Sequence, residues 1–382
     1  MTIISNELKK IFNIKSILLL IIITTIMYFL FIEFNITNFP NGRPVLDIYN
    51  IFVDMKDCYG EFMDEEEFED FKIKYEKAKK EADKYIQSRE DFRELGIMNY
   101  NELIYMNENN TTNKEFEKLH VDVFFERVID VFWELPYREK YIKAYENRGE
   151  FMLNGVENEK QEARIRDILE KGIETSVFTN VVFSNYNELI KPVAITILLG
   201  VMFMITPIYI RDNKDKINYL QYTSKTGRNI FKKKMIAGLL AVSIIITLQL
   251  ICFFTLYSSN NVSMFYNCNI NSINNIMVSW YDLTFIQYII LTVVGIYILA
   301  FVFALISMVI SSIGQNYITL IGIQLPIALF TFTVLLKYLL LYITSINYPK
   351  YFWAIAYIVL ILIGTISMMI RWRKERKMDI VD

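Results

Sequence analysis

The chain has 382 residues, of which 53% are hydrophobic and 21% charged, and its formal net charge is only −2. The charge is unevenly distributed, because residues 34–187 hold 33 acidic and 21 basic side chains (net −12) while the rest carries +10. This segregation argues against a soluble protein and favours a membrane protein with a basic cytosolic rim and an acidic outer domain.

The first 15 residues read MTIISNELKKIFNIK, with apolar residues at roughly helical spacing and Lys9, Lys10 and Lys15 opposite or beside them. The pattern predicts an amphipathic helix over residues 1–15 that lies on the inner membrane surface. The alternative is an unstructured basic flank, since the apolar stripe is only two turns long. No small-residue cleavage site follows the next apolar run, so we expect a retained first transmembrane helix over residues 16–33.

Residues 34–187 are expected to form a mainly helical extracellular domain. A long amphipathic helix is predicted within 61–95, where apolar side chains recur at helical spacing: Phe62, Phe68, Phe71, Tyr75 and Ala78. Further helices are predicted over 114–133, 137–147 and 158–174, broken at Pro136 and Gly149. The single histidine, His120, is interpreted as a packing or surface residue.

Five more apolar runs are long enough to cross about 30 Å of hydrocarbon. The second transmembrane helix is expected at 188–210, and the third to sixth lie within 235–370: 235–257, 284–311, 317–344 and 352–370. The connection 211–234 carries eight Lys or Arg, 258–283 carries none, and the tail 371–382 begins RWRKERK. The sequence therefore predicts an all-α polytopic protein of the plasma membrane, with six transmembrane helices and both termini cytosolic. Lys337, near the outer end of its span, is interpreted as snorkelling to the interface and not as an ion site.

The motifs of several enzyme classes are missing from the chain. It has no G-x-x-x-x-G-K-[ST], no H-E-x-x-H and no G-x-S-x-G, and its three cysteines have no zinc-ligand spacing. We therefore expect a protein that is not an enzyme, that binds no metal or cofactor of its own, and that has no nucleic-acid partner.

The membrane part resembles the permease subunit of a type-2 ABC exporter. The segment NELKKIF at 6–12 is similar to the interfacial helix of that family, and the loop between spans two and three, with its Gly227–Arg228 turn and Lys234, resembles the coupling segment. The six-span topology also matches, whereas the outer insertion of residues 34–187 departs from the common pattern. The resemblance implies a second permease, as a homo- or heterodimer, and a P-loop ATPase subunit that carries ATP and Mg²⁺. It also implies export of a peptide or another amphipathic substrate.

The loop 211–234 is the candidate site for coupling to the ATPase. Residues 212–222 can form about three helical turns, and a short helix parallel to the membrane can dock into a groove of an ATPase. The residues expected to carry the coupling are Asp212, Lys216, Leu220, Thr223, Gly227 and Arg228. The alternative is an ordinary basic loop that only sets the topology.

Two further hypotheses concern the outer side. The alternative to transport is a membrane sensor or scaffold whose extracellular domain binds a ligand. Cys58 and Cys268 both fall on the outer side by the sidedness argument, so a disulfide between them is a candidate clamp of the domain, with two unpaired thiols as the alternative.

Overall fold

The computed structural model describes residues 2–109, 113–215, 217, 227–314 and 316–377. The chain forms two compact units. Unit 1 comprises Met1–Phe39, Ser184–Asn261 and Ile286–Asp382, and unit 2 comprises Pro40–Phe183 and Val262–Phe285. The described residues are mostly helical and form no β-strand beyond two isolated bridges, Phe62–Ser176 and Asn269–Thr284.

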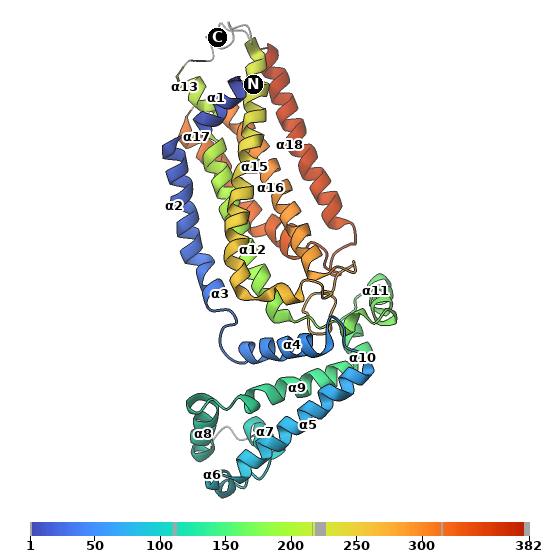
Figure 1. Ribbon diagram of the computed structural model, residues 1–382. Helices are drawn as coiled ribbons and strands as arrows, with labels where there is room; N and C mark the ends of the chain where they lie inside the picture. The colour runs from blue at the N-terminus through green and yellow to red at the C-terminus, as the bar shows by residue number, and fades with distance from the viewer. Residues whose placement is uncertain (1, 110–112, 216, 218–226, 315, 378–382) are drawn as a thin grey trace. The chain divides into compact units, whose positions relative to one another are not determined.

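Among the described residues, six helical segments are long and apolar enough to cross a membrane, and except for residues 180–183 and 285 they belong to unit 1. They are α2 (Ile14–Phe31), α12 (Asn180–Ile205) continued by α13 (Pro207–Lys214), α15 (Ile230–Tyr257), α16 (Phe285–Ile313), α17 (Tyr317–Phe330) with two π-helical turns (Thr331–Leu335 and Lys337–Leu341), and α18 (Phe352–Lys377). The prediction of six apolar spans is confirmed. α1 (Thr2–Ile11), α13 and the last turns of α18 lie at the same end of this bundle (Figure 1).

The outer faces of the bundle are apolar. α2 has no buried residue, and large apolar side chains on several helices are exposed, such as Phe29 (67%), Ile318 (84%) and Ile355 (60%). Apolar faces of this extent are unfavourable in water and favourable in hydrocarbon. Unit 1 is therefore embedded in a membrane.

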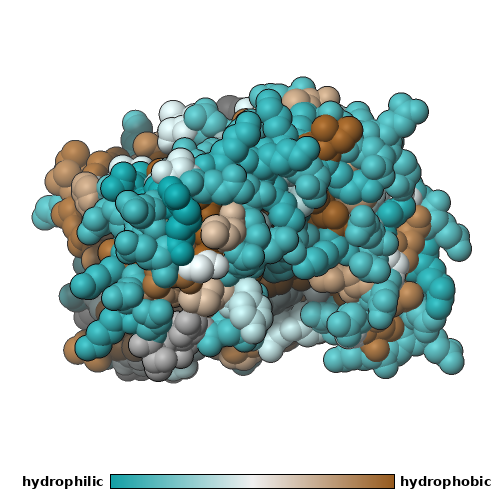
Figure 2. All heavy atoms as spheres, turned by 90° about the horizontal axis from the view of Figure 1, so that it is seen from below, coloured by the Kyte–Doolittle hydropathy of each residue, from teal (hydrophilic) through white to brown (hydrophobic). Residues whose placement is uncertain are grey.

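Unit 2 is mainly helical, as expected. It contains α4 (Val45–Tyr59), α5 (Glu65–Gln87), α6 (Glu90–Glu94), α7 (Tyr100–Asn109), α8 (Lys114–Val121), a π-helical turn (Asp122–Glu126), α9 (Asp130–Glu146), α10 (Arg148–Leu153) and α11 (Glu159–Glu170). The short α3 (Glu33–Thr37) belongs to unit 1. Figure 2, seen from the side where α5 and α9 lie in Figure 1, shows a mainly hydrophilic surface with scattered hydrophobic residues.

The long amphipathic helix predicted within 61–95 is α5, and it is shorter than expected. A capping box sets its start: Asp64 accepts from the Glu67 amide at 2.9 Å, and Glu67 accepts from the Asp64 amide at 2.8 Å. Phe68, Phe71 and Tyr75 form its buried face, but Phe62 lies before the helix and is 43% exposed.

One predicted helix break is wrong and another is displaced. Pro136 lies inside α9, whereas the break expected at Gly149 occurs at Asn147, between α9 and α10. A proline costs the helix one hydrogen bond to the carbonyl four residues earlier. In α9 its neighbours Phe132, Leu135 and Tyr141 are all buried, so we infer that their packing outweighs the lost bond.

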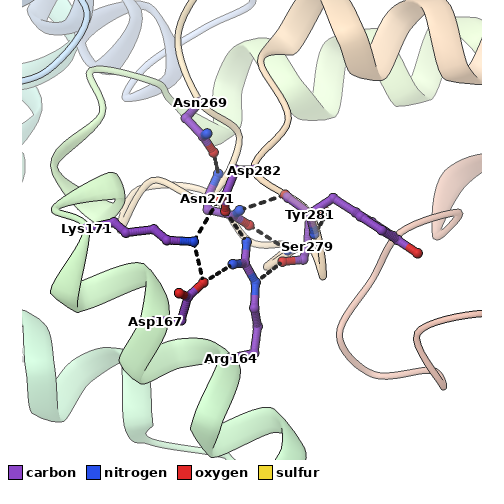
Figure 3. Close-up of polar contacts among 8 residues, drawn as sticks. All are labelled: Arg164, Asp167, Lys171, Asn269, Asn271, Ser279, Tyr281 and Asp282. Atoms are coloured by element: carbon purple, nitrogen blue, oxygen red, sulfur yellow. Dashed lines mark hydrogen bonds and ion pairs between the residues drawn. The ribbon is translucent and has the colours of Figure 1, made fainter.

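The segment Val262–Phe285 belongs to unit 2, although we expected a plain outer loop between the third and fourth spans. Figure 3 shows the reason in a network of charged and polar groups. Arg164 of α11 ion-pairs with Asp282, pairs with Asp167 at 2.7 Å, and donates to the Ser279 carbonyl at 3.1 Å. The Lys171 ammonium lies 2.8 Å from the Asp167 carboxylate and 3.2 Å from the Asp282 carboxylate. The Arg164 side chain is 9% exposed, whereas Asp167, Lys171 and Asp282 are 41%, 49% and 37% exposed. The network therefore binds the segment to α11 through a buried guanidinium with partners at the surface.

Candidate functional site

The candidate site lies at the end of unit 1 where α1, α13 and α15 meet. Its centre is a buried ion pair in which the Lys234 ammonium donates to the Asp212 carboxylate, and each residue is only 2% exposed. A charged group this deeply buried requires a partner of opposite sign, because the loss of hydration is otherwise uncompensated. The pair joins the last turn of α13 to the first turns of α15, and therefore joins the two ends of the connection between them.

Helix α1 contributes a second pair of charges to the same cluster. The Lys10 ammonium lies 2.8 Å from Glu7 and 3.5 Å from Asp212. Burial lowers the pKa of Lys10, but the hydrogen bond to Glu7 and the charge of Asp212 outweigh that effect and raise it above its usual value. Two carboxylates and two ammonium groups thus form a charge-balanced cluster that holds α1 against α13.

Aromatic packing supports the ion pair. The rings of Tyr209 and Phe231 stack with centroids 4.6 Å apart, and the Tyr209 hydroxyl donates to the Phe231 carbonyl at 2.9 Å. The Lys234 ammonium lies 5.5 Å from the centre of the Tyr209 ring. α13 and α15 are therefore joined by an ion pair, a ring stack and a hydrogen bond, all buried.

The first turn of α13 is tied to α16 through Ser311. The amides of Tyr209 and Ile210 both donate to the Ser311 hydroxyl oxygen at 3.2 Å, and that hydroxyl donates to the Thr206 carbonyl. Amides in the first turn of a helix have no partner within the helix, so an outside acceptor stabilises the break between α12 and α13. Pro207 at the start of α13 fits this break, because a proline there removes one of the unpaired amides.

Helix α18 contributes its last turns to the same end of the bundle. The Trp372 ring has the Lys232 ammonium 4.0 Å and the Arg376 guanidinium 5.0 Å from its centre, and Arg228 donates to the Arg376 carbonyl. Arg371 also donates to the Ser312 side chain at 2.7 Å. Lys232 and Arg228 thus hold the start of α15 against the last turns of α18.

The structure changes the interpretation of the predicted coupling residues. Arg211–Lys214 belongs to α13 and residues 230–234 to α15, so the predicted loop 211–234 is shorter than expected. Asp212 is buried and holds the helices together, so it is not a surface contact for a partner. Gly227 and Arg228 begin a single 3-10 turn before α15, and Gly227 has φ +52°, a conformation that favours glycine. Lys216, Leu220 and Thr223 lie outside the described residues.

The candidate disulfide is not formed, and the alternative of two unpaired thiols agrees with the structure. Cys58 and Cys268 are both free, with Cys58 exposed and Cys268 completely buried. Burial raises the pKa of Cys268 to about 12, so it remains a thiol at neutral pH. The contacts that hold Val262–Phe285 within unit 2 are the polar network of Figure 3 and apolar packing, and not a covalent bond.

No protein-family model matches this chain, and neither the curated proteins nor the solved structures include a significant match.

Proposed function

We propose that the chain is the membrane-spanning permease subunit of an ABC exporter for a peptide or another amphipathic substrate, driven by a separate P-loop ATPase. The observation that carries the proposal is the buried Lys234–Asp212 pair, which joins the two ends of the basic connection between α13 and α15. If the ends of a loop are not fixed, movement of the loop itself absorbs a displacement caused by a partner. If the ends are fixed to each other, the displacement is transmitted to α12 and α15 together.

Two further observations support the same function. The Glu7–Lys10–Asp212 contacts place α1 against the end of α13, so a partner that contacts the connection also acts on α1 and, through it, on α2. The sequence 211–234 is basic, with eight Lys or Arg against two Asp, which suits a cytosolic position. In this proposal both termini are cytosolic, unit 2 is extracellular, and two permeases pair around the transport pathway.

The test is affinity purification of the chain from its native membranes, which should recover a P-loop ATPase, followed by measurement of ATP hydrolysis. We expect charge reversal at Lys216 and Arg228 to abolish the stimulation of hydrolysis by the permease. The matched control reverses Arg373 and Lys374, two exposed cations at the same end of the bundle. Equal loss in both variants would indicate a general charge effect and contradict a coupling site.

The same preparation separates the proposal from a sensor or scaffold. A permease should be recovered with two copies of this chain and two ATPases in one particle, measured by native mass spectrometry. Recovery without any ATPase, in a particle that still binds an outer ligand, would favour the sensor.

A further inference from the structure

A basic pocket lies at the end of unit 1, where the start of α2 and the start of α17 meet α1 and α13. Its volume is about 200 Å³. The apolar residues of its lining are Ile11, Met204, Pro207 and Ile208. The charged residues of its lining are Glu7, Lys10, Lys15, Arg211 and Asp212. The ion pairs of the candidate site use only some of these charges, so the pocket holds cations that have no partner within the fold.

The two carboxylates of the lining are nearly closed to solvent and already neutralised. Glu7 and Asp212 are 5% and 2% exposed. Lys10 lies 2.8 Å from Glu7 and 3.5 Å from Asp212, and Asp212 also pairs with Lys234, which lies outside the lining. Two ammonium groups therefore balance the two carboxylates. A ligand that enters the pocket meets no accessible anion among its lining residues.

The two remaining cations of the lining are accessible. Lys15 in the first turn of α2 and Arg211 in α13 are both exposed, and neither side chain has an ion pair or a hydrogen bond among the described residues. The next charges along α13, Lys214 and Asp215, have opposite signs and lie outside the lining. With Lys234 counted, four cations stand against two carboxylates, which leaves a net charge of +2. The pocket therefore favours an anion.

The pocket lies at the boundary between the polar end of unit 1 and its apolar outer face. In α2, Ile14 and Leu18 are 69% and 52% exposed, and Lys15 lies between them in the sequence. In α17, Ile318 is 84% exposed and directly follows Tyr317 of the lining. Exposed apolar side chains in the first turns of two membrane helices belong in hydrocarbon. A ligand at this boundary meets cations and hydrocarbon together, which suits a phospholipid better than a soluble anion.

We propose that this pocket binds the phosphate of an anionic phospholipid, with Lys15 and Arg211 as its counter-ions and the acyl chains against the exposed apolar residues at the starts of α2 and α17. A guanidinium matches the oxygens of a phosphate with two parallel donors, and an ammonium adds a point charge. Basic pockets between membrane helices suit anionic headgroups. The bound phosphate would link α2 to α13. The inference does not depend on transport, because a sensor in the same membrane would use the same pocket.

The experiment is native mass spectrometry of the full chain in detergent, titrated with phosphatidylglycerol and with phosphatidylcholine of the same acyl chains. We expect a saturable first phosphatidylglycerol, bound more tightly than the first phosphatidylcholine. Lys15→Gln and Arg211→Gln should each weaken the binding of phosphatidylglycerol about fivefold, because each removes one cation near the headgroup. Lys15→Arg keeps the charge and should retain the binding.

The matched controls are Lys9→Gln in α1 and Arg373→Gln in α18, two exposed cations that do not line the pocket. Neither should change the binding of phosphatidylglycerol. Thermal melts show whether each variant is folded, and Lys15→Gln and Arg211→Gln test the site independently of each other if one of them is unstable.

Three results would overturn the proposal. Equal binding of the two lipids would remove the anionic class. Equal weakening by the pocket variants and the controls would indicate a general charge effect at this end of the bundle. Glycerophosphoglycerol, the headgroup without acyl chains, should bind far more weakly than the lipid, and equal binding of the two would indicate a site for a soluble phosphate.

Discussion

Removal of the Lys234 ammonium should destabilise unit 1 more than any other single change at the bundle end. Lys234→Met keeps an apolar stem of similar length but leaves Asp212 buried without its main partner. Breaking a buried ion pair costs about 3–5 kcal/mol. Because Lys10 still lies 3.5 Å from Asp212, we expect the lower end, about 3 kcal/mol. For a unit of about 200 residues, this is a fall of about 6–12 °C in the thermal midpoint.

The assay is thermal unfolding of the detergent-solubilised chain, followed by intrinsic fluorescence. Lys233→Met is the matched control, because Lys233 is the adjacent residue on α15 and is not buried. The double variant Lys234→Met with Asp212→Asn removes both charges and should be more stable than Lys234→Met alone. The effect should persist at high salt, since buried pairs are poorly screened.

Two results would refute this reasoning. If Lys234→Met and Lys233→Met lowered the midpoint equally, the loss would come from net charge and not from the buried pair. If the double variant lost as much stability as Lys234→Met and Asp212→Asn lose separately when added together, Asp212 and Lys234 would not be coupled. The connection between α13 and α15 would then lack the fixed ends on which the proposed function depends.

Three further predictions concern unit 2. Arg164→Ala should increase proteolysis of Val262–Phe285, because it removes contacts to two carboxylates and a carbonyl, whereas Arg166→Ala on the exposed side of α11 should not. Burial lowers the pKa of His120 below its usual 6.5, so the folded state favours the neutral ring. The stability that depends on the neutral ring is therefore fully present above pH 6.5 and is lost as the pH falls through the folded pKa. Because the chain has one histidine, its imidazole signals in NMR can be assigned without mutation, and a titration at or above 6.5 would contradict this. A charged maleimide should label Cys58 rapidly and Cys268 only after unfolding, measured by peptide mapping in a Cys252→Ser background, and equal rates would show that Cys268 is accessible.

The sequence by itself determined the six apolar helices and the helical character of unit 2. Both depend on local properties: runs of about 20 apolar residues are incompatible with water, and a stripe such as Phe68, Phe71 and Tyr75 forms one face of a helix. The start of α5 could also be read locally, because the Asp64–Glu67 capping box lies within four residues. The predicted break at Pro136 is wrong because packing against distant elements, which local sequence does not show, decides whether the helix continues there.

Only the tertiary structure showed which residues act together. Asp212 and Lys234 were predicted as parts of one basic loop, but Glu7 and Lys10 were not recognised as their neighbours, because nothing local marks a contact across about 200 residues. The assignment of Val262–Phe285 to unit 2 likewise involves pairings between distant residues, such as Arg164 with Asp282. Charged residues favour water until a specific partner compensates the loss of hydration, and the partner is determined by the fold and not by sequence spacing.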